Sequence, residues 1–200
     1  MVIVRVIGAG NMLTGPALNE FAERQIRDGY RRFVFDLQPC QALDSTFMGC
    51  MVGIATSLKK ESLRTEAEPE TASEVAEGPL QELSPEEALA VLRAEMALGT
   101  NSAPPRPHAT FAVAINASPE VRELLGILGV DKFVPLLGQL QLPEMETTIL
   151  PNVEMTPDER RTMILKAHEN LVEIDKRNEA QFGAFLKSLS SELSKPRPGA

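Results

Sequence analysis

Two kinds of hydrophobic pattern alternate along the first 60 residues. Residues 2–7 and 32–37 are short runs rich in β-branched and aromatic side chains, which are typical of buried strands. Residues 15–28 and 45–58 carry apolar side chains at three- and four-residue steps, and this spacing indicates one buried helix face. Because strand and helix alternate in this order, the pattern predicts an α/β fold with a small parallel or mixed sheet and helices packed on it.

The same alternation resumes near residue 108. Residues 109–115 form another apolar run typical of a buried strand, and a leucine-rich helix pattern follows from Ser118 to Gly129. Ser118 precedes a proline and a glutamate, which is typical of a helix start. The sequence therefore predicts one domain made of residues 1–60 and 108–137.

An acidic insertion, residues 61–107, separates these two blocks. It contains ten Glu and three Arg, a net charge of −7 out of −8 for the whole chain. Residues 61–78 show no apolar periodicity, which predicts disorder, whereas a capping box at Ser84 predicts a short helix to about residue 98. We expect a surface insertion that can be deleted without unfolding the domain. An acidic docking arm is the alternative.

The C-terminal part predicts an extension outside this domain. Residues 138–156 read as a connector, residues 157–193 as a helix that starts at a capping box, and residues 194–200 as a frayed tail. A single straight helix of this length, roughly 55 Å, would be longer than a domain of ~100 residues is wide. We expect a bend at Gly183, with the first half docked on the domain. Residues 182–193 would then supply a surface for a partner or for self-association.

Composition and charge exclude several classes of function. The net charge of −8 comes without a basic stripe, which argues against nucleic-acid binding. No apolar run approaches the ~18 residues of a membrane span, and no charged-then-apolar leader opens the chain. Cys40 and Cys50 read as reduced thiols of a cytoplasmic protein.

The glycines after the first strand suggest a nucleotide-binding loop. Gly8 and Gly10 resemble the beginning of a dinucleotide fingerprint, in which glycines let a pyrophosphate approach a helix N-terminus. Leu13 occupies the place of the third small residue, and Asp36 closes the next strand slightly late for a ribose ligand. A nicotinamide-dependent oxidoreductase is therefore kept only as a minor alternative.

Other catalytic or metal-binding chemistry finds little support in the sequence. His108 and His168 are far apart, lack cysteine or carboxylate neighbours at ligand spacing, and read as surface or strand-edge residues. Ser45 lacks the Gly-x-Ser-x-Gly elbow and an evident triad, which argues against a hydrolase. Asp36 and Asp44 read as polar loop groups. The sequence predicts no enzyme, no cofactor and no metal site.

The stretch with the most specific signal is Asp44-Ser45-Thr46. It follows a strand and a short loop and opens the helix of residues 45–58, which places Ser45 at or next to the N-cap. The simplest interpretation is that Ser45 caps this helix and has no other role.

Two blocks of this chain resemble the STAS domain of anti-sigma-factor antagonists. The first is the strand, loop and Asp44-Ser45-Thr46 helix start; the second is the strand, Ser118-Pro-Glu-Val and leucine-rich helix. The resemblance implies that a partner serine kinase, itself the anti-sigma factor, phosphorylates Ser45. It also implies partner-binding roles for the residues around this serine: Asp44, Thr46, Met48, Gly10 and Asn11.

Two positions depart from the pattern of this family. Phe47 stands where the family usually has glycine, and Asn11 stands where members often carry an aspartate. Both departures favour a second hypothesis, in which the protein is a STAS-like scaffold that works without phosphorylation. The intact Asp44-Ser45-Thr46 favours the phosphorylation switch.

Overall fold

The computed structural model describes residues 1–67, 86, 90, 92–93 and 110–194. It confirms a mixed α/β architecture with parallel strands. In chain order the elements are β1 (Val2–Arg5), β2 (Gly8–Gly10), α1 (Gly15–Arg27), β3 (Arg32–Asp36), β4 (Cys40–Leu43), α2 (Ser45–Ala67), β5 (Phe111–Ile115), α4 (Pro119–Ile127), the 3₁₀ helix η1 (Val130–Lys132), α5 (Pro157–Ile174) and α6 (Arg177–Leu193). None of the described helices is both long and apolar enough to cross a membrane.

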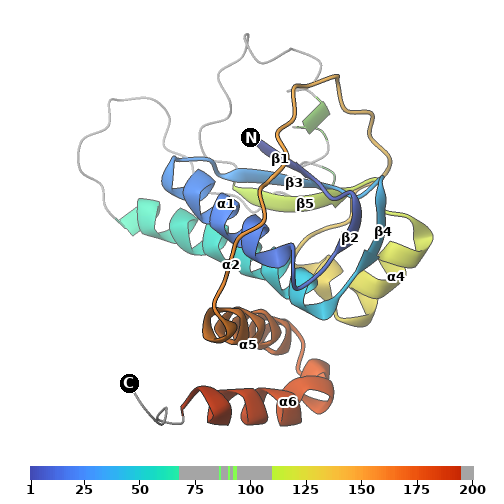
Figure 1. Ribbon diagram of the computed structural model, residues 1–200. Coiled ribbons are helices and arrows are strands. Elements are labelled where there is room, and N and C mark those ends of the chain that lie inside the picture. Colours follow the sequence, from blue (N-terminus) through green and yellow to red (C-terminus); the bar gives the residue numbers. More distant parts are fainter. Residues whose placement is uncertain (68–85, 87–89, 91, 94–109, 195–200) are drawn as a thin grey trace.

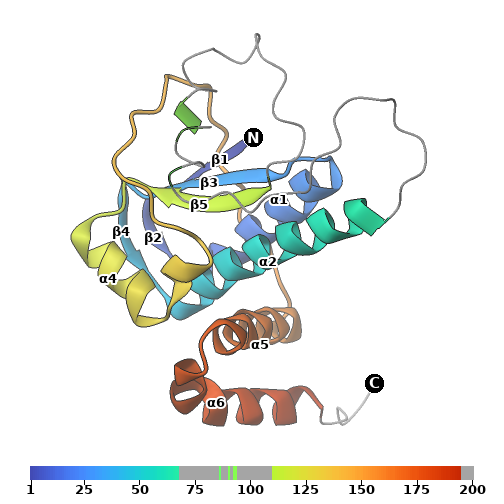
Figure 2. The same cartoon turned by 180° about the vertical axis from the view of Figure 1, so that it is seen from behind.

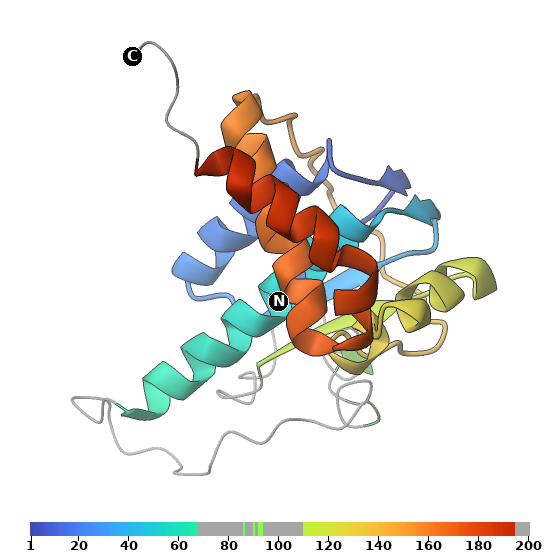
Figure 3. The same cartoon turned by 90° about the horizontal axis from the view of Figure 1, so that it is seen from below.

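Parallel strands in the order β1-β3-β5 form the main sheet, and β2 pairs in parallel with β4 beside it. Helices α1, α2, α5 and α6 lie in successive layers under this sheet, and α4 lies at the side, next to β4 (Figures 1 and 2). Helices α1 and α2 cover one face of the sheet, α5 packs beneath α2, and α6 packs beneath α5. The view from below shows α6 as the outermost layer (Figure 3).

Side chains alternate between the two faces of the sheet, as expected for strands. Phe33 and Phe35 of β3 are fully buried in the larger core cluster, which includes residues of α1 and α2. Val34 points to the opposite face, where a second buried cluster contains Val113 and Leu92. Because Leu92 is only 1% exposed, the acidic insertion contributes a core residue.

The sequence placed several boundaries differently. Gly8–Gly10 was expected to be a turn and Cys40 to lie in a loop, yet they pair as β2 and β4. Helix α2 continues past Lys60 to Ala67, into a stretch predicted to be disordered. The rest of that stretch lies outside the described residues, but Glu86 and Leu92 are helical, in agreement with the short helix predicted in the insertion.

The C-terminal helix breaks at a different position from the one predicted. Helix α5 ends at Ile174 and α6 begins at Arg177, so the bend is at Asp175 and Lys176 instead of Gly183. A methyl group added to Gly183 would meet only Glu179 at an ordinary 3.6 Å, so this glycine is not needed for a close approach. The two helices fold back on each other as an antiparallel pair, the α5–α6 hairpin (Figure 3).

A buried carboxylate ties the strands to the segment after β5. Asp36 is 1% exposed and accepts a hydrogen bond from the Nε of Arg5 at 2.8 Å and one from the side-chain amide of Asn116 at 2.9 Å. Asn116 also exchanges two hydrogen bonds with the backbone of Leu140. Asp36 therefore has a structural role, and no hydrogen bond pairs it with Asp44 among the described contacts.

Candidate functional site

The start of helix α2 is held by Asp44. One carboxylate oxygen accepts from the backbone N–H of Phe47 at 2.8 Å, and the other accepts from the N–H of Met12 at 2.8 Å. The backbone carbonyl of Asp44 accepts from Met48 N–H, and its own N–H donates to the carbonyl of Gly10. Asp44 is thus the capping residue, which leaves the side chain of Ser45, the next residue, available for another contact.

Ser45 forms a hydrogen bond with His168, a residue 123 positions away on α5. The Ser45 Oγ and His168 Nε2 atoms lie 2.9 Å apart, and His168 Nδ1 lies 2.8 Å from the carbonyl oxygen of Ile164. Since a carbonyl oxygen can only accept, Nδ1 carries a proton, and in the neutral imidazole Nε2 then presents a lone pair. The Ser45 hydroxyl therefore donates to His168.

His168 is buried, so its interpretation as a surface residue was wrong. It is 5% exposed, and its ring makes T-shaped contacts with the rings of Phe182 and Phe185 from α6, with centroid distances of 4.8 and 5.1 Å. His108 lies outside the described residues. One sequence signal could have singled out His168: it shares a helical stripe with the apolar Ile164 and Leu171, where a polar side chain needs a partner.

Two glycines of α2 allow α5 to approach closely. A methyl group added at Gly49 would overlap the backbone carbonyl of Ala167, and one added at Gly53 would lie 2.7 Å from the amide nitrogen of Asn170. Asn170 is buried and donates to the carbonyl of Gly49 at 3.0 Å. The face of α2 that carries these glycines is consequently covered by α5, and Ser45 at the start of the helix is half-buried.

The other predicted partner-binding residues lie around the same helix start. Thr46 and Met48 are buried at 5% and 3% exposure. Gly10 packs against the ring of Phe47, where an added methyl group would lie 2.8 Å from a ring carbon. Asn11 shapes the next loop, its side-chain oxygen accepting from Leu13 N–H at 2.9 Å. The structure thus brings all five to the start of α2, with Phe47 filling the space that Gly10 leaves.

The glycine-rich stretch lacks the geometry of a phosphate loop. Gly8–Gly10 forms strand β2 and pairs with β4, whereas a dinucleotide fingerprint needs a turn that leads directly into a helix N-terminus. Both cysteines are buried free thiols, and burial raises the pKa of Cys50 to about 12. Within the described ranges no three His, Cys, Asp or Glu side chains are grouped to hold a metal ion.

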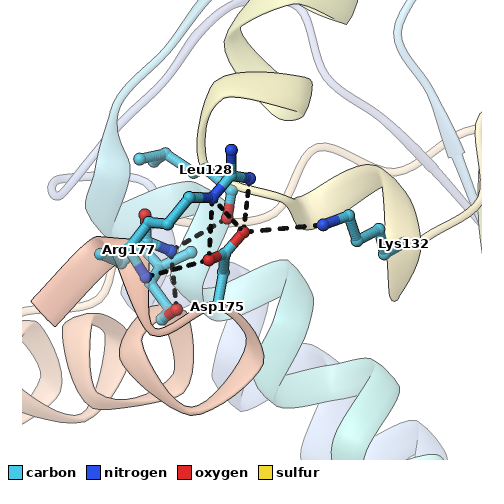
Figure 4. Close-up of polar contacts among 6 residues, drawn as sticks. Leu128, Lys132, Asp175 and Arg177 are labelled. Atoms are coloured by element: carbon cyan, nitrogen blue, oxygen red, sulfur yellow. Dashed lines mark hydrogen bonds and ion pairs between the residues drawn. The ribbon is translucent and has the colours of Figure 1, made fainter.

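A second set of polar contacts anchors the bend of the α5–α6 hairpin to the domain (Figure 4). Asp175, whose side chain is 10% exposed, accepts hydrogen bonds from Arg177 and lies 3.7 Å from the Nζ of Lys132 in η1. Asn178 donates to the carbonyls of Leu128 and of the last turn of α5. These contacts fix the bend at Asp175, because they would be lost if the helix ran straight.

The contacts of Asp175 at the bend, called the Asp175 anchor below, predict that the protein loses stability in acid. Hydrogen bonds and charge from Arg177 hold the pKa of Asp175 well below its usual range. A lowered pKa in the folded state contributes stability above the unfolded value of about 3.9, and that contribution is lost as pH falls below it. We expect Asp175 to contribute nothing to the pH dependence of the free energy of unfolding between pH 7 and about 5. Below about pH 4 the wild type should lose stability faster than Asp175→Asn.

Urea unfolding at a series of pH values measures this difference. Glu192→Gln, which removes an exposed carboxylate at the far end of α6, is the matched control and should follow the wild type. Parallel curves for wild type and Asp175→Asn below pH 4 would contradict the assignment of the anchor.

Comparison with known proteins adds no assignment to this geometry. No protein-family model and no curated protein matches the chain.

Proposed function

We propose that the protein is a STAS-like signalling module of the anti-sigma-factor antagonist type, which binds a partner serine kinase and is switched by phosphorylation of Ser45. The observation that carries this proposal is the helix start itself. Asp44 caps α2, so Ser45 occupies the first helical position with its hydroxyl free of the capping role. The parallel order β1-β3-β5 and the end of β2 at Gly10, which accepts a hydrogen bond from Asp44 N–H, are consistent with it.

The switch has a simple electrostatic form. A phosphate on Ser45 adds about −1.5 to −2 charges next to the carboxylate of Asp44. Inside an interface this extra charge repels acidic groups and resists desolvation, so the partner dissociates. The positive end of the α2 dipole favours the phosphate, which keeps the modified protein folded.

The test compares Ser45→Asp with Ser45→Ala in binding to the partner captured from the native host. Ser45→Asp should weaken binding at least about tenfold, because like charges in an interface cost several kcal/mol. Ser45→Ala should bind and carry no phosphate when phosphorylation sites are mapped by mass spectrometry.

Ser118→Asp is the matched control for this experiment. Ser118 caps helix α4, where aspartate is an equally good cap, so the same charge is added at another helix start. Binding that is equal for Ser45→Asp and wild type, with no phosphate on Ser45 in the host, would rule out the switch.

One observation favours the second candidate, a scaffold that works without phosphorylation. The hydroxyl of Ser45 already donates to His168, and α5 covers the glycine face of α2. A chain that uses this face permanently for its own hairpin would present other surfaces to its partners. Partner binding that is indifferent to Ser45→Asp and to host phosphorylation would support this scaffold.

A further inference from the structure

We propose that the α5–α6 hairpin is a built-in cover over Ser45, so that a kinase reaches this serine only after α5 has left α2. This inference rests on the proposed function and names the regulation of its site. The cover and the site belong to one chain, and the contacts between them are described above at the level of single atoms.

The first argument is where the buried polar groups of α5 are directed. Only two polar side chains of α5, His168 and Asn170, are buried, and both bond to the first two turns of α2. His168 accepts a hydrogen bond from the hydroxyl of Ser45, and Asn170 donates one to the carbonyl of Gly49. Burying polar groups costs stability unless they are paired, so these partners specify where α5 sits.

The second argument is the fit of the two backbones. Gly49 and Gly53 are one turn apart, and α5 lies so close that even one added methyl group at Gly49 would overlap Ala167. No other chain can occupy this face of α2 while α5 is in place. A partner that reads the start of α2 must therefore compete with the hairpin.

The third argument is that the hydroxyl proton, which a kinase must remove, is engaged by His168 in the closed hairpin. In the transfer, the Oγ–P bond forms and the bond from the γ-phosphorus to the bridging oxygen of ATP breaks. ADP then leaves, and the hydroxyl proton goes to a base of the kinase. In the closed hairpin this proton lies in the hydrogen bond from Ser45 to His168 Nε2, so the kinase base competes with His168 for it. Opening of the hairpin frees the hydroxyl from His168 and therefore favours phosphorylation.

The experiment opens the hairpin with a single methyl group in the full-length chain. Gly49→Ala places this methyl group against Ala167, whereas Gly126→Ala makes the same change in α4, where the nearest neighbour lies at 3.9 Å. Each is combined with Ser45→Cys, and the alkylation rate by iodoacetamide is read at residue 45 by mass spectrometry. Buried Cys40 in β4 serves as the internal reference, whereas Cys50 contacts Met163 of α5 and should also react faster if the hairpin opens.

We expect Gly49→Ala to raise the alkylation rate at residue 45 roughly 5- to 150-fold, and Gly126→Ala to leave it unchanged. With serine retained at position 45, a native-host extract with ATP should phosphorylate Gly49→Ala faster than wild type. Gly53→Ala is a milder second variant, because its methyl group meets only the amide end of Asn170. If Gly49→Ala fails to fold, Gly53→Ala should still raise the alkylation rate at residue 45 above that of the chain with both glycines, by less than the range expected for Gly49→Ala.

The outcomes separate this inference from the proposed function. Unchanged alkylation in both glycine variants would overturn the cover, whether or not Ser45 is phosphorylated. Faster alkylation with equal phosphorylation of wild type and Gly49→Ala would overturn the regulation but leave the switch. Faster alkylation with no phosphate on Ser45 in any chain would overturn the proposed function, and the regulatory role with it.

Discussion

Replacing Leu92 by alanine is expected to lower the free energy of unfolding by about 2–5 kcal/mol, the usual range for truncating a buried leucine. Leu92 is 1% exposed and packs against Val34 and Val113 on the face of the sheet opposite α2. An effect of this size would make the acidic insertion part of the core. It would also contradict the prediction from sequence that residues 61 to about 104 can be deleted without loss of the fold.

Urea unfolding followed by circular dichroism measures this loss. Arg93→Ala is the matched control, because Arg93 is the exposed helical neighbour of Leu92 and its truncation should change stability by less than about 0.5 kcal/mol. Equal midpoints for Leu92→Ala and wild type would show that the cluster is complete without the insertion.

Asp36→Ala is expected to cost about 2–4 kcal/mol, since hydrogen bonds to a buried charged group contribute roughly 1.5–3 kcal/mol each and are not additive. The substitution removes the acceptor shared by Arg5 and Asn116 and leaves the N–H of Gln38 without its carboxylate. Most of the loss comes from the buried end of this network, because the Arg5 side chain is 43% exposed and screened by water.

A double-mutant cycle separates these contributions. Arg5→Met should cost less than Asp36→Ala, and combining Asp36→Ala with Asn116→Ala should cost less than the sum of the two. Thermal and urea unfolding of wild type, Asp36→Ala, Asn116→Ala and the double variant measure the coupling energy between Asp36 and Asn116. Strict additivity of Asp36 and Asn116 would contradict a shared network.

Local sequence signals predicted those parts of the fold that local energetics determine. Helix α1 begins at Gly15 and Pro16, α4 begins after the cap Ser118, and α5 begins at the capping box of Thr156. In each case the cap or the proline acts within one helical turn, so the residues that fix the boundary lie next to it in sequence. Strands β1, β3 and β5 were likewise predicted from their apolar runs, because this signal lies within the few residues of each strand.

Other parts depend on residues that are far apart in the sequence. Gly8–Gly10 has no preference for a strand by itself and becomes one only because β4 lies beside it. The bend at Asp175 depends on Leu128 and Lys132, in the preceding part of the domain.

The candidate site was predicted only in part for the same reason. The stretch around Asp44 and Ser45 was found from sequence, because the capping contacts are local. His168 was not found, because no local pattern links it to a serine 123 residues away.

The order of the chain gives the hairpin a consequence during protein synthesis. Ser45 and the glycines of α2 leave the ribosome long before α5, which must be made before it can cover them. The strands of the main sheet are all made once β5 ends at Ile115, whereas α5 ends at Ile174. At about 5–20 residues per second, the stretch between these two residues takes roughly 3–12 seconds to translate. For that interval the nascent chain displays a bare helix face, accessible to other proteins, which α5 covers in the finished protein.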